Sequence, residues 1–102
     1  MLKTEGQGIG YLDARNLRGS HDIYSALKQK PLDLIIDCTK NVPDNNLLSE
    51  IYNFQIKQNR CCVIILPVEK QINFPEFWDL APTKTEALDL ISFGQIQRKL
   101  NF

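Results

Sequence analysis

The chain contains little histidine, and this scarcity excludes several kinds of chemistry. His21 is the only histidine among 102 residues, whereas a zinc site needs three or four ligands at suitable spacing. The adjacent pair Cys61 and Cys62 lies inside an apolar stretch and is not a ligand pair. A nucleophilic serine or cysteine also needs a base, normally histidine. We therefore expect no metal, no cofactor and no catalytic residues.

Other absences bear on the compartment and the partners. The longest apolar runs, 34–36 and 61–67, are shorter than the roughly 20 residues that cross a bilayer. The start of the chain also lacks the apolar core of a signal peptide. Twelve basic residues balance twelve acidic ones, so the basic surface typical of nucleic-acid binding is missing. We expect one cytoplasmic domain, residues 1–102, that binds neither membranes nor nucleic acid.

The cysteines fit that compartment. There are three of them, an odd number, and neighbouring residues of a strand point to opposite faces. Cys61 and Cys62 should therefore not bridge each other, and each should behave as a small buried apolar residue.

Three glycines near the start predict a turn. Gly6, Gly8 and Gly10 lie between two short segments with β character, 2–5 and 9–12, which favours a β-hairpin. The spacing is not a dinucleotide-binding fingerprint, because no apolar strand precedes it and no helix follows directly.

Beyond this hairpin, continuously apolar segments alternate with amphipathic ones. Strands buried on both faces are continuously apolar, and each covering helix shows one apolar stripe. The predicted elements are a short helix within 15–31 capped by Ser20, strand 32–38, helix 45–58, strand 61–66, a short strand at 80–83 and a helical tail at 83–100. The sequence thus predicts an α/β fold in which a small mixed sheet, a hairpin plus parallel strands, is flanked by helices.

The tail carries two N-terminal capping signals. Thr83 with Glu86 forms one capping box, and Ser92 with Gln95 forms a second. The apolar residues on the two sides of Ser92 are also out of phase; they are Ala87, Leu88 and Ile91 before it and Phe93, Ile96 and Leu100 after it. This pattern predicts two short helices that meet near Ser92.

Ligand sites of open α/β sheets lie at the carboxyl ends of the parallel strands. Asp37 and Cys38 end the first central strand, and Asp44 follows in the same loop. At a helix N-terminus the pKa of Cys38 could be lowered, although a buried, inert thiol is the commoner situation for cysteine. Asp44 is most simply a helix cap.

Four segments together resemble the STAS domain of bacterial anti-sigma factor antagonists, in its short stand-alone form. They are Leu34-Ile-Ile-Asp-Cys-Thr-Lys, Val42-Pro-Asp-Asn-Asn-Leu-Leu, Cys62-Val-Ile-Ile and Ala81-Pro-Thr-Lys-Thr-Glu-Ala-Leu. The resemblance covers roughly residues 20–102. It implies the same mixed α/β fold and a non-enzymatic regulatory module whose partner is another protein, such as a kinase-like anti-sigma factor.

The resemblance breaks down at the residue that regulates the family. In STAS antagonists a kinase phosphorylates a serine or threonine that follows the loop aspartate, and the added charge at a helix N-terminus switches binding. Here Asn45 and Asn46 follow Asp44, Leu47 replaces a family glycine, and Ser49 lies one turn into the helix. The resemblance therefore implies a constitutive or differently regulated interaction.

The same resemblance assigns the partner surface. Its residues are Thr39, Lys40, Asp44, Asn45, Asn46 and Ser49. The aromatic cluster of Phe74, Phe77 and Trp78, expected as one helical turn over the sheet edge, would extend it, because aromatic residues are enriched at interfaces.

Three alternatives stay open at this point. The chain could be a small-ligand binder or enzyme that uses Asp37 and Cys38, an accessory subunit of a nucleic-acid-processing enzyme, or a homodimer. Nuclease activity of the chain itself is not expected, because the two-metal hydrolases of RNA processing need several histidines.

Overall fold

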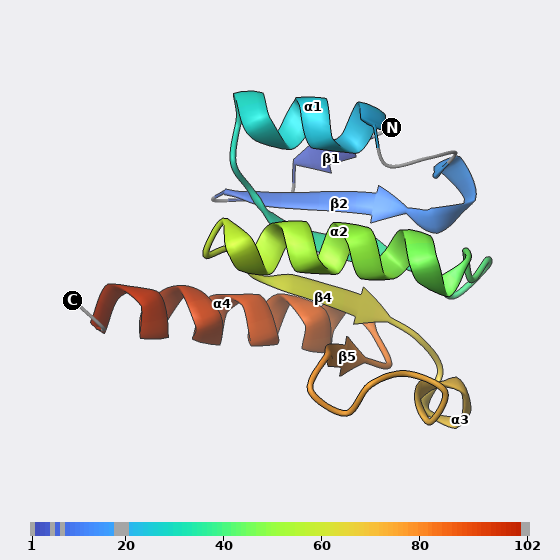
Figure 1. The fold of residues 1–102 in the computed structure, drawn as a ribbon. Coiled ribbons are helices and arrows are strands. Elements are labelled where there is room, and N and C mark those ends of the chain that lie inside the picture. The colour runs from blue at the N-terminus through green and yellow to red at the C-terminus, as the bar shows by residue number, and fades with distance from the viewer. Residues whose placement is uncertain (1, 5, 7, 18–20, 101–102) are drawn as a thin grey trace.

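The computed structural model describes residues 2–4, 6, 8–17 and 21–100, although not the side chain of His21. These residues contain a five-stranded sheet in the order β1-β2-β3-β4-β5 (Figure 1). The strands are β1 (Leu2–Thr4), β2 (Ile9–Asp13), β3 (Asp33–Asp37), β4 (Cys62–Ile65) and β5 (Asp79–Ala81). The β1–β2 pair is antiparallel and the other three pairs are parallel. The predicted mixed sheet is confirmed.

Helices connect the strands. They are the 3₁₀ helix η1 (Ala14–Asn16) and the α-helices α1 (His21–Gln29), α2 (Asn45–Lys57), α3 (Val68–Gln71) and α4 (Lys84–Leu100). Helix α4 runs along β4 and β5 (Figure 1). The positions of α1, α2, β3 and β4 agree with the sequence prediction within a few residues. The predicted cap Ser20 lies outside the described residues.

The two faces of the sheet have separate cores. On β3, Leu34 and Ile36 pack in a cluster with residues of α1 and α2, whereas Ile35 packs in a second cluster with Ala87 and Ile91 of α4. All five of these residues are fully buried, with an exposed fraction of 0%. This two-sided burial explains why β3 and β4 are continuously apolar, as expected for central parallel strands.

The tail is one continuous helix, so the prediction of two helices meeting near Ser92 is wrong. The residues after Ser92 that are out of phase with the buried stripe face solvent; Phe93, Ile96 and Leu100 are 60%, 56% and 76% exposed. The second capping signal is not used as a cap, because the Gln95 side chain donates a hydrogen bond to Asp33 instead. The Thr83 cap of the first box is confirmed: Glu86 N donates to Thr83 Oγ1 at 3.2 Å.

The aromatic cluster also differs from the prediction. Helix α3 ends at Gln71, and residues 72–78 form turns instead of a helical turn over the sheet edge. Phe74 and Trp78 belong to the core, and the ring of Trp78 stacks on Tyr52 with centroids 4.7 Å apart. Only Phe77 of the cluster is strongly exposed, at 77%. Phe74 and Trp78 therefore serve mainly to cover the sheet, and only Phe77 of the cluster presents its ring to solvent.

Candidate functional site

The predicted partner loop begins where β3 ends. The Asp37 carboxylate accepts hydrogen bonds from the backbone N–H of Thr39 at 3.0 Å and from its hydroxyl at 2.6 Å. At the other end of the loop, Asp44 caps helix α2 and accepts from Asn46 N at 3.3 Å. The predicted capping role of Asp44 is thus confirmed. The loop is held at both ends by short side-chain bonds to its own backbone, a common arrangement for Asp.

The side chains of this loop are presented to solvent. Thr39, Lys40, Asp44, Asn45 and Asn46 are exposed, and Val42 is 38% exposed. Ser49 is half-buried on the next turn of α2. The six residues of the predicted surface therefore lie on one continuous segment, and five of them are exposed to another molecule.

Cys38 does not fit the catalytic alternative. Its side chain belongs to the core and the residue is only 1% exposed. Burial, with smaller contributions from Asp37 and Asp13, raises the pKa of the Cys38 thiol to about 12. The hypothesis of a lowered pKa is therefore wrong, because the thiolate needs contact with a cation or a helix N-terminus that the buried thiol lacks.

The sequence prediction missed two neighbours of Asp37, Tyr11 and Asp13, and a cation that stands beside Tyr11. The hydroxyl of Tyr11 on β2 donates to Asp37 Oδ2, Asp13 lies opposite Asp37 in the strand register, and the Lys84 ammonium stands 4.5 Å from the centre of the Tyr11 ring. Burial raises the pKa of Asp37, but the hydrogen bonds from Thr39 and Tyr11 outweigh it and the net shift is downward.

These groups form a polar cluster at the carboxyl ends of β2 and β3. Asp13 carries its own ion pair, because its carboxylate accepts from Arg15 NH2 at 2.7 Å. The side-chain and backbone hydrogen bonds from Arg15 lower the pKa of Asp13 to about 2. Both carboxylates are thus ionised at neutral pH and hydrogen-bonded within the chain. The period-two alternation of strands could have shown that Tyr11 and Asp13 share a face, but not that β2 lies beside β3.

A second polar centre lies at the opposite edge of the sheet, where β3 begins. The buried carboxylate of Asp33 forms an ion pair with Arg98 of α4, in which NH1 and NH2 bond the two oxygens at 2.8 and 3.0 Å. Asp33 also accepts from Cys61 N and from Gln95 Nε2, each at 2.8 Å. Burial raises the pKa of Asp33, but these hydrogen bonds together bring it below its ordinary value.

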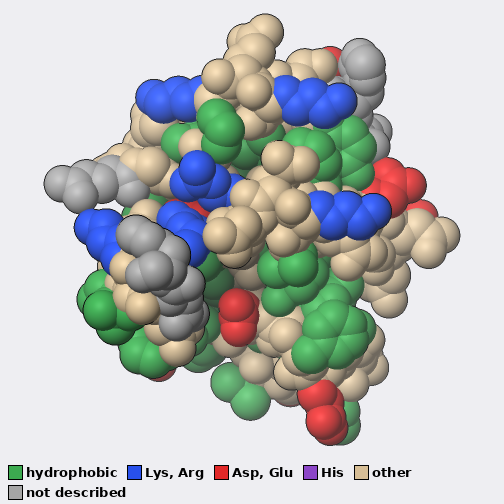
Figure 2. All heavy atoms as spheres, turned by 60° about the vertical axis from the view of Figure 1, so that its left-hand side comes forward, with side chains coloured by type: hydrophobic (Ala, Val, Ile, Leu, Met, Phe, Trp, Pro, Cys, Tyr) green, Lys and Arg blue, Asp and Glu red, His purple; other side chains and the backbone are tan. Residues whose placement is uncertain are grey.

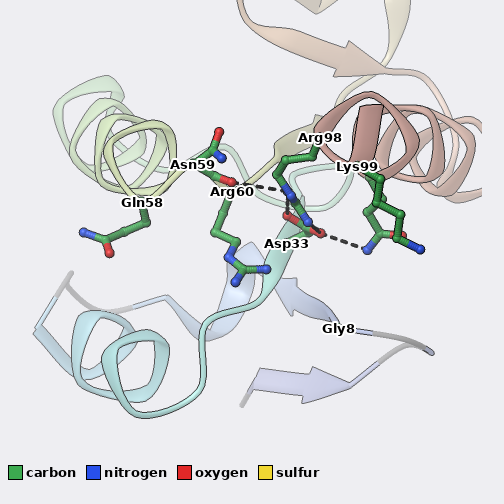
Figure 3. A pocket seen from close by; sticks show the side chains of 8 residues that line it. Gly8, Asp33, Gln58, Asn59, Arg60, Arg98 and Lys99 are labelled. Atoms are coloured by element: carbon green, nitrogen blue, oxygen red, sulfur yellow. Dashed lines mark hydrogen bonds and ion pairs between the residues drawn. The ribbon is translucent and has the colours of Figure 1, made fainter. Parts of the chain in front are cut away.

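This ion pair forms the floor of a pocket (Figure 3). The pocket has a volume of about 500 Å³ and is lined by Gly8, Asp33, Gln58, Asn59, Arg60, Gln95, Arg98 and Lys99. Arg60 follows the end of α2, whereas Gln95, Arg98 and Lys99 come from the last turns of α4. Nothing in the sequence brings these two segments together, because the contact depends on how α2 and α4 end at the same edge.

No group of three or more histidine, cysteine or carboxylate side chains in the described part of the chain is arranged to hold a metal ion. No helix among the described residues is long and apolar enough to cross a bilayer.

Comparison with known proteins gives no family assignment. No protein-family model matches the chain. A search of curated protein sequences likewise finds no significant match.

Proposed function

We propose that the chain is a non-enzymatic, STAS-like module that binds another protein through the loop between β3 and α2. The observation that carries this proposal is the loop itself: Asp37 and Asp44 fix its two ends by hydrogen bonds, while its side chains stay exposed. A loop that is already ordered loses little conformational entropy when a partner binds. The mixed sheet also supports the proposal, because it is the architecture that the resemblance implies.

The start of α2 explains how the proposed interaction would differ from the family. Helix N-termini favour negative charge, and STAS antagonists use this position for a phosphorylated hydroxyl. Here the exposed residues after Asp44 are Asn45 and Asn46, whose amides cannot be phosphorylated. The half-buried Ser49 is a poor acceptor because a kinase needs an accessible hydroxyl. We propose that binding is constitutive or is regulated by other means.

The compartment belongs to the same proposal. All three cysteines have free thiols, and Cys38 and Cys62 are buried. Unpaired thiols suit a reducing compartment, so we place the protein in the cytoplasm. The homodimer stays a prediction, which sedimentation velocity at two protein concentrations would test.

Affinity capture from cell extract, followed by mass spectrometry and binding assays with the purified partner, tests the proposal. Asn46→Asp should weaken binding about tenfold, or about 1.4 kcal/mol, because it removes two N–H donors and adds a negative charge at the contact. Asn46→Ser, which keeps a neutral hydrogen-bonding side chain, should change affinity less than about twofold.

The matched control is Asn53→Asp, the same substitution at an exposed position two turns further along α2. It should leave both affinity and thermal stability unchanged. If Asn46→Asp and Asn53→Asp bind the partner as tightly as the wild type, the loop is not the contact. Recovery of no protein that binds the purified chain would contradict the proposal as a whole.

A further inference from the structure

We propose that the pocket at the amino ends of β3 and β4 binds a small molecule that carries two anionic oxygen groups, through Arg60 and Lys99. This pocket lies at the opposite edge of the sheet from the loop of the proposed function, and the two inferences are independent. Some charges in the pocket are already paired within the chain, and others are left to meet a ligand.

The Asp33–Arg98 ion pair is a complete internal unit. The two oxygens of Asp33 accept four hydrogen bonds, two of them from Arg98 and one each from Cys61 N and Gln95 Nε2. The Asp33 side chain is only 1% exposed and that of Arg98 is 25% exposed. This pair fastens α4 to the start of β3, and the charge of Arg98 is neutralised by the carboxylate.

The pocket keeps two further cations. Three basic side chains and one acidic side chain line it. Because Asp33 neutralises Arg98, the positive charges of Arg60 and Lys99 remain. Neither side chain forms a hydrogen bond or an ion pair with any other residue that the structure describes. The whole chain has no net charge, so this excess of two positive charges is local to the pocket.

The two cations are placed on different walls. Figure 3 shows Arg60 on one side of the Asp33–Arg98 pair and Lys99 on the other, with Asn59 above Arg60 and Gln58 further from the pair, to the left. Figure 2, which turns this end of the molecule forward, shows several Lys and Arg side chains gathered on the upper part of the face. One anionic group at each cation would therefore span the pocket, which favours a ligand with two such groups over a single small ion.

The position of Arg60 is fixed by its backbone. Arg60 N donates to Gln55 O at 2.9 Å, and Asn59 adopts a left-handed conformation with φ of 56° that turns the chain at the end of α2. The buried Gln55 side chain donates to Leu32 O and Cys61 O. The side chain of Arg60, a half-buried residue, thus starts from a rigid backbone, which lowers the entropic cost of binding.

Size and chemistry agree with such a ligand. A volume of about 500 Å³ lies within the range of small-molecule sites, roughly 300–1,000 Å³. Guanidinium groups bind phosphate and carboxylate oxygens in a bidentate manner, and lysine binds them as a point charge. Pyrophosphate and citrate represent the two sources of this chemistry, phosphate esters and polycarboxylates.

Titration of the ¹⁵N-labelled protein with sodium pyrophosphate, and separately with sodium citrate, at constant ionic strength tests the inference. The backbone amide signals of Gly8, Asn59, Arg60 and Lys99 should shift in a saturable manner. Arg60→Gln and Lys99→Gln should each weaken binding about tenfold, since charge-assisted hydrogen bonds are lost. Lys70→Gln, the same change on the remote helix α3, is the control and should leave binding unchanged.

The outcomes are distinct. Saturable binding of pyrophosphate alone supports a phosphate-containing ligand, and binding of citrate alone supports a polycarboxylate. Binding of neither probe, or equal weakening by Lys70→Gln and Arg60→Gln, overturns the inference. Asn46→Asp should bind the probes like the wild type, so failure of the proposed loop interaction and failure of this pocket are told apart.

Discussion

Gly94 in the middle of α4 lies directly against Cys61, the residue before β4. A Cβ atom added to Gly94 would stand only 2.5 Å from Cys61 Sγ, well inside ordinary contact distance. Glycine in a helix interior costs about 1 kcal/mol relative to alanine. We infer that glycine is present here because it lets the helix approach the sheet this closely.

Gly94→Ala should therefore destabilise the protein by about 1–3 kcal/mol, as overpacking does, although alanine is the better helix former. Urea unfolding followed by circular dichroism measures the change. The double variant Gly94→Ala with Cys61→Ala should regain stability relative to Gly94→Ala alone, because the sulfur is gone. A stabilised Gly94→Ala single variant would show that α4 and β4 are not this close.

Removing the charge of Asp33 should be among the most damaging single changes. Asp33→Asn leaves Arg98 without its anion, and breaking a largely buried ion pair costs about 3–5 kcal/mol; the partial exposure of Arg98 favours the lower end. Equilibrium unfolding in urea is the measurement. The control is Asp13→Asn in the exposed pair with Arg15, which should change stability little. Equal effects of the two variants would contradict the structural role of Asp33.

The Asp33 pair should also make stability depend on pH. Because the folded-state pKa of Asp33 is lowered, its contribution is present above the unfolded-state pKa of about 3.9 and is lost as the pH falls through the folded-state value. The stability difference between the wild type and Asp33→Asn should thus be constant from about pH 7 to 5 and shrink on further acidification. Urea unfolding at a series of pH values checks this. A stability difference that grows in acid would contradict the lowered pKa of Asp33 in the folded state.

The three thiols should differ in reactivity. With its pKa raised to about 12, Cys38 is ionised in only about one molecule in ten thousand at pH 8. Cys62 is buried and its pKa is raised as well, whereas Cys61 is half-buried. Iodoacetamide labelling read by mass spectrometry should modify Cys61 first and the other two only in urea. Fast labelling of Cys38 in the native protein would revive the catalytic alternative.

Truncation of two nearby residues of α4 should change stability to very different extents. Ile91 is fully buried and Ile91→Ala should cost about 2–5 kcal/mol. Phe93 is 60% exposed, and Phe93→Ala should change stability by less than about 0.5 kcal/mol in a monomer. Urea unfolding compares them. A large loss for Phe93→Ala would favour the two-helix reading of the tail or a buried interface at this face.

Local patterns predicted most of the fold. These patterns involve residues that are close together in the sequence, so they can be recognised directly. They are the apolar runs of β3 and β4, the Asp44 cap, and the pairing of Thr83 with Glu86. The misreading of the tail has a physical cause: Ser92 and Gln95 have the spacing of a cap, but the distant carboxylate of Asp33 binds the Gln95 side chain. Tertiary contacts override local propensity in this way.

The candidate sites were predictable only in part. The loop residues are contiguous, so their common location followed from the sequence. The partners of Asp33 and Asp37 did not, because Arg98 is 65 positions from Asp33 and Tyr11 is 26 from Asp37. Such contacts depend on strand order and helix placement, and the pocket of Arg60 and Lys99 depends on both.

The division of the core between two faces has a consequence for how the chain comes together during synthesis. Residues of α1 and α2 can cover one side of β3 early, but Ile35 and the Asp33 carboxylate meet their partners on α4 only when that helix has emerged. Until then the nascent protein carries a bare apolar surface beside an unmatched negative charge. Helix α4, which follows all of these strands along the chain, thus completes the hydrophobic interior and neutralises its buried anion in a single docking event.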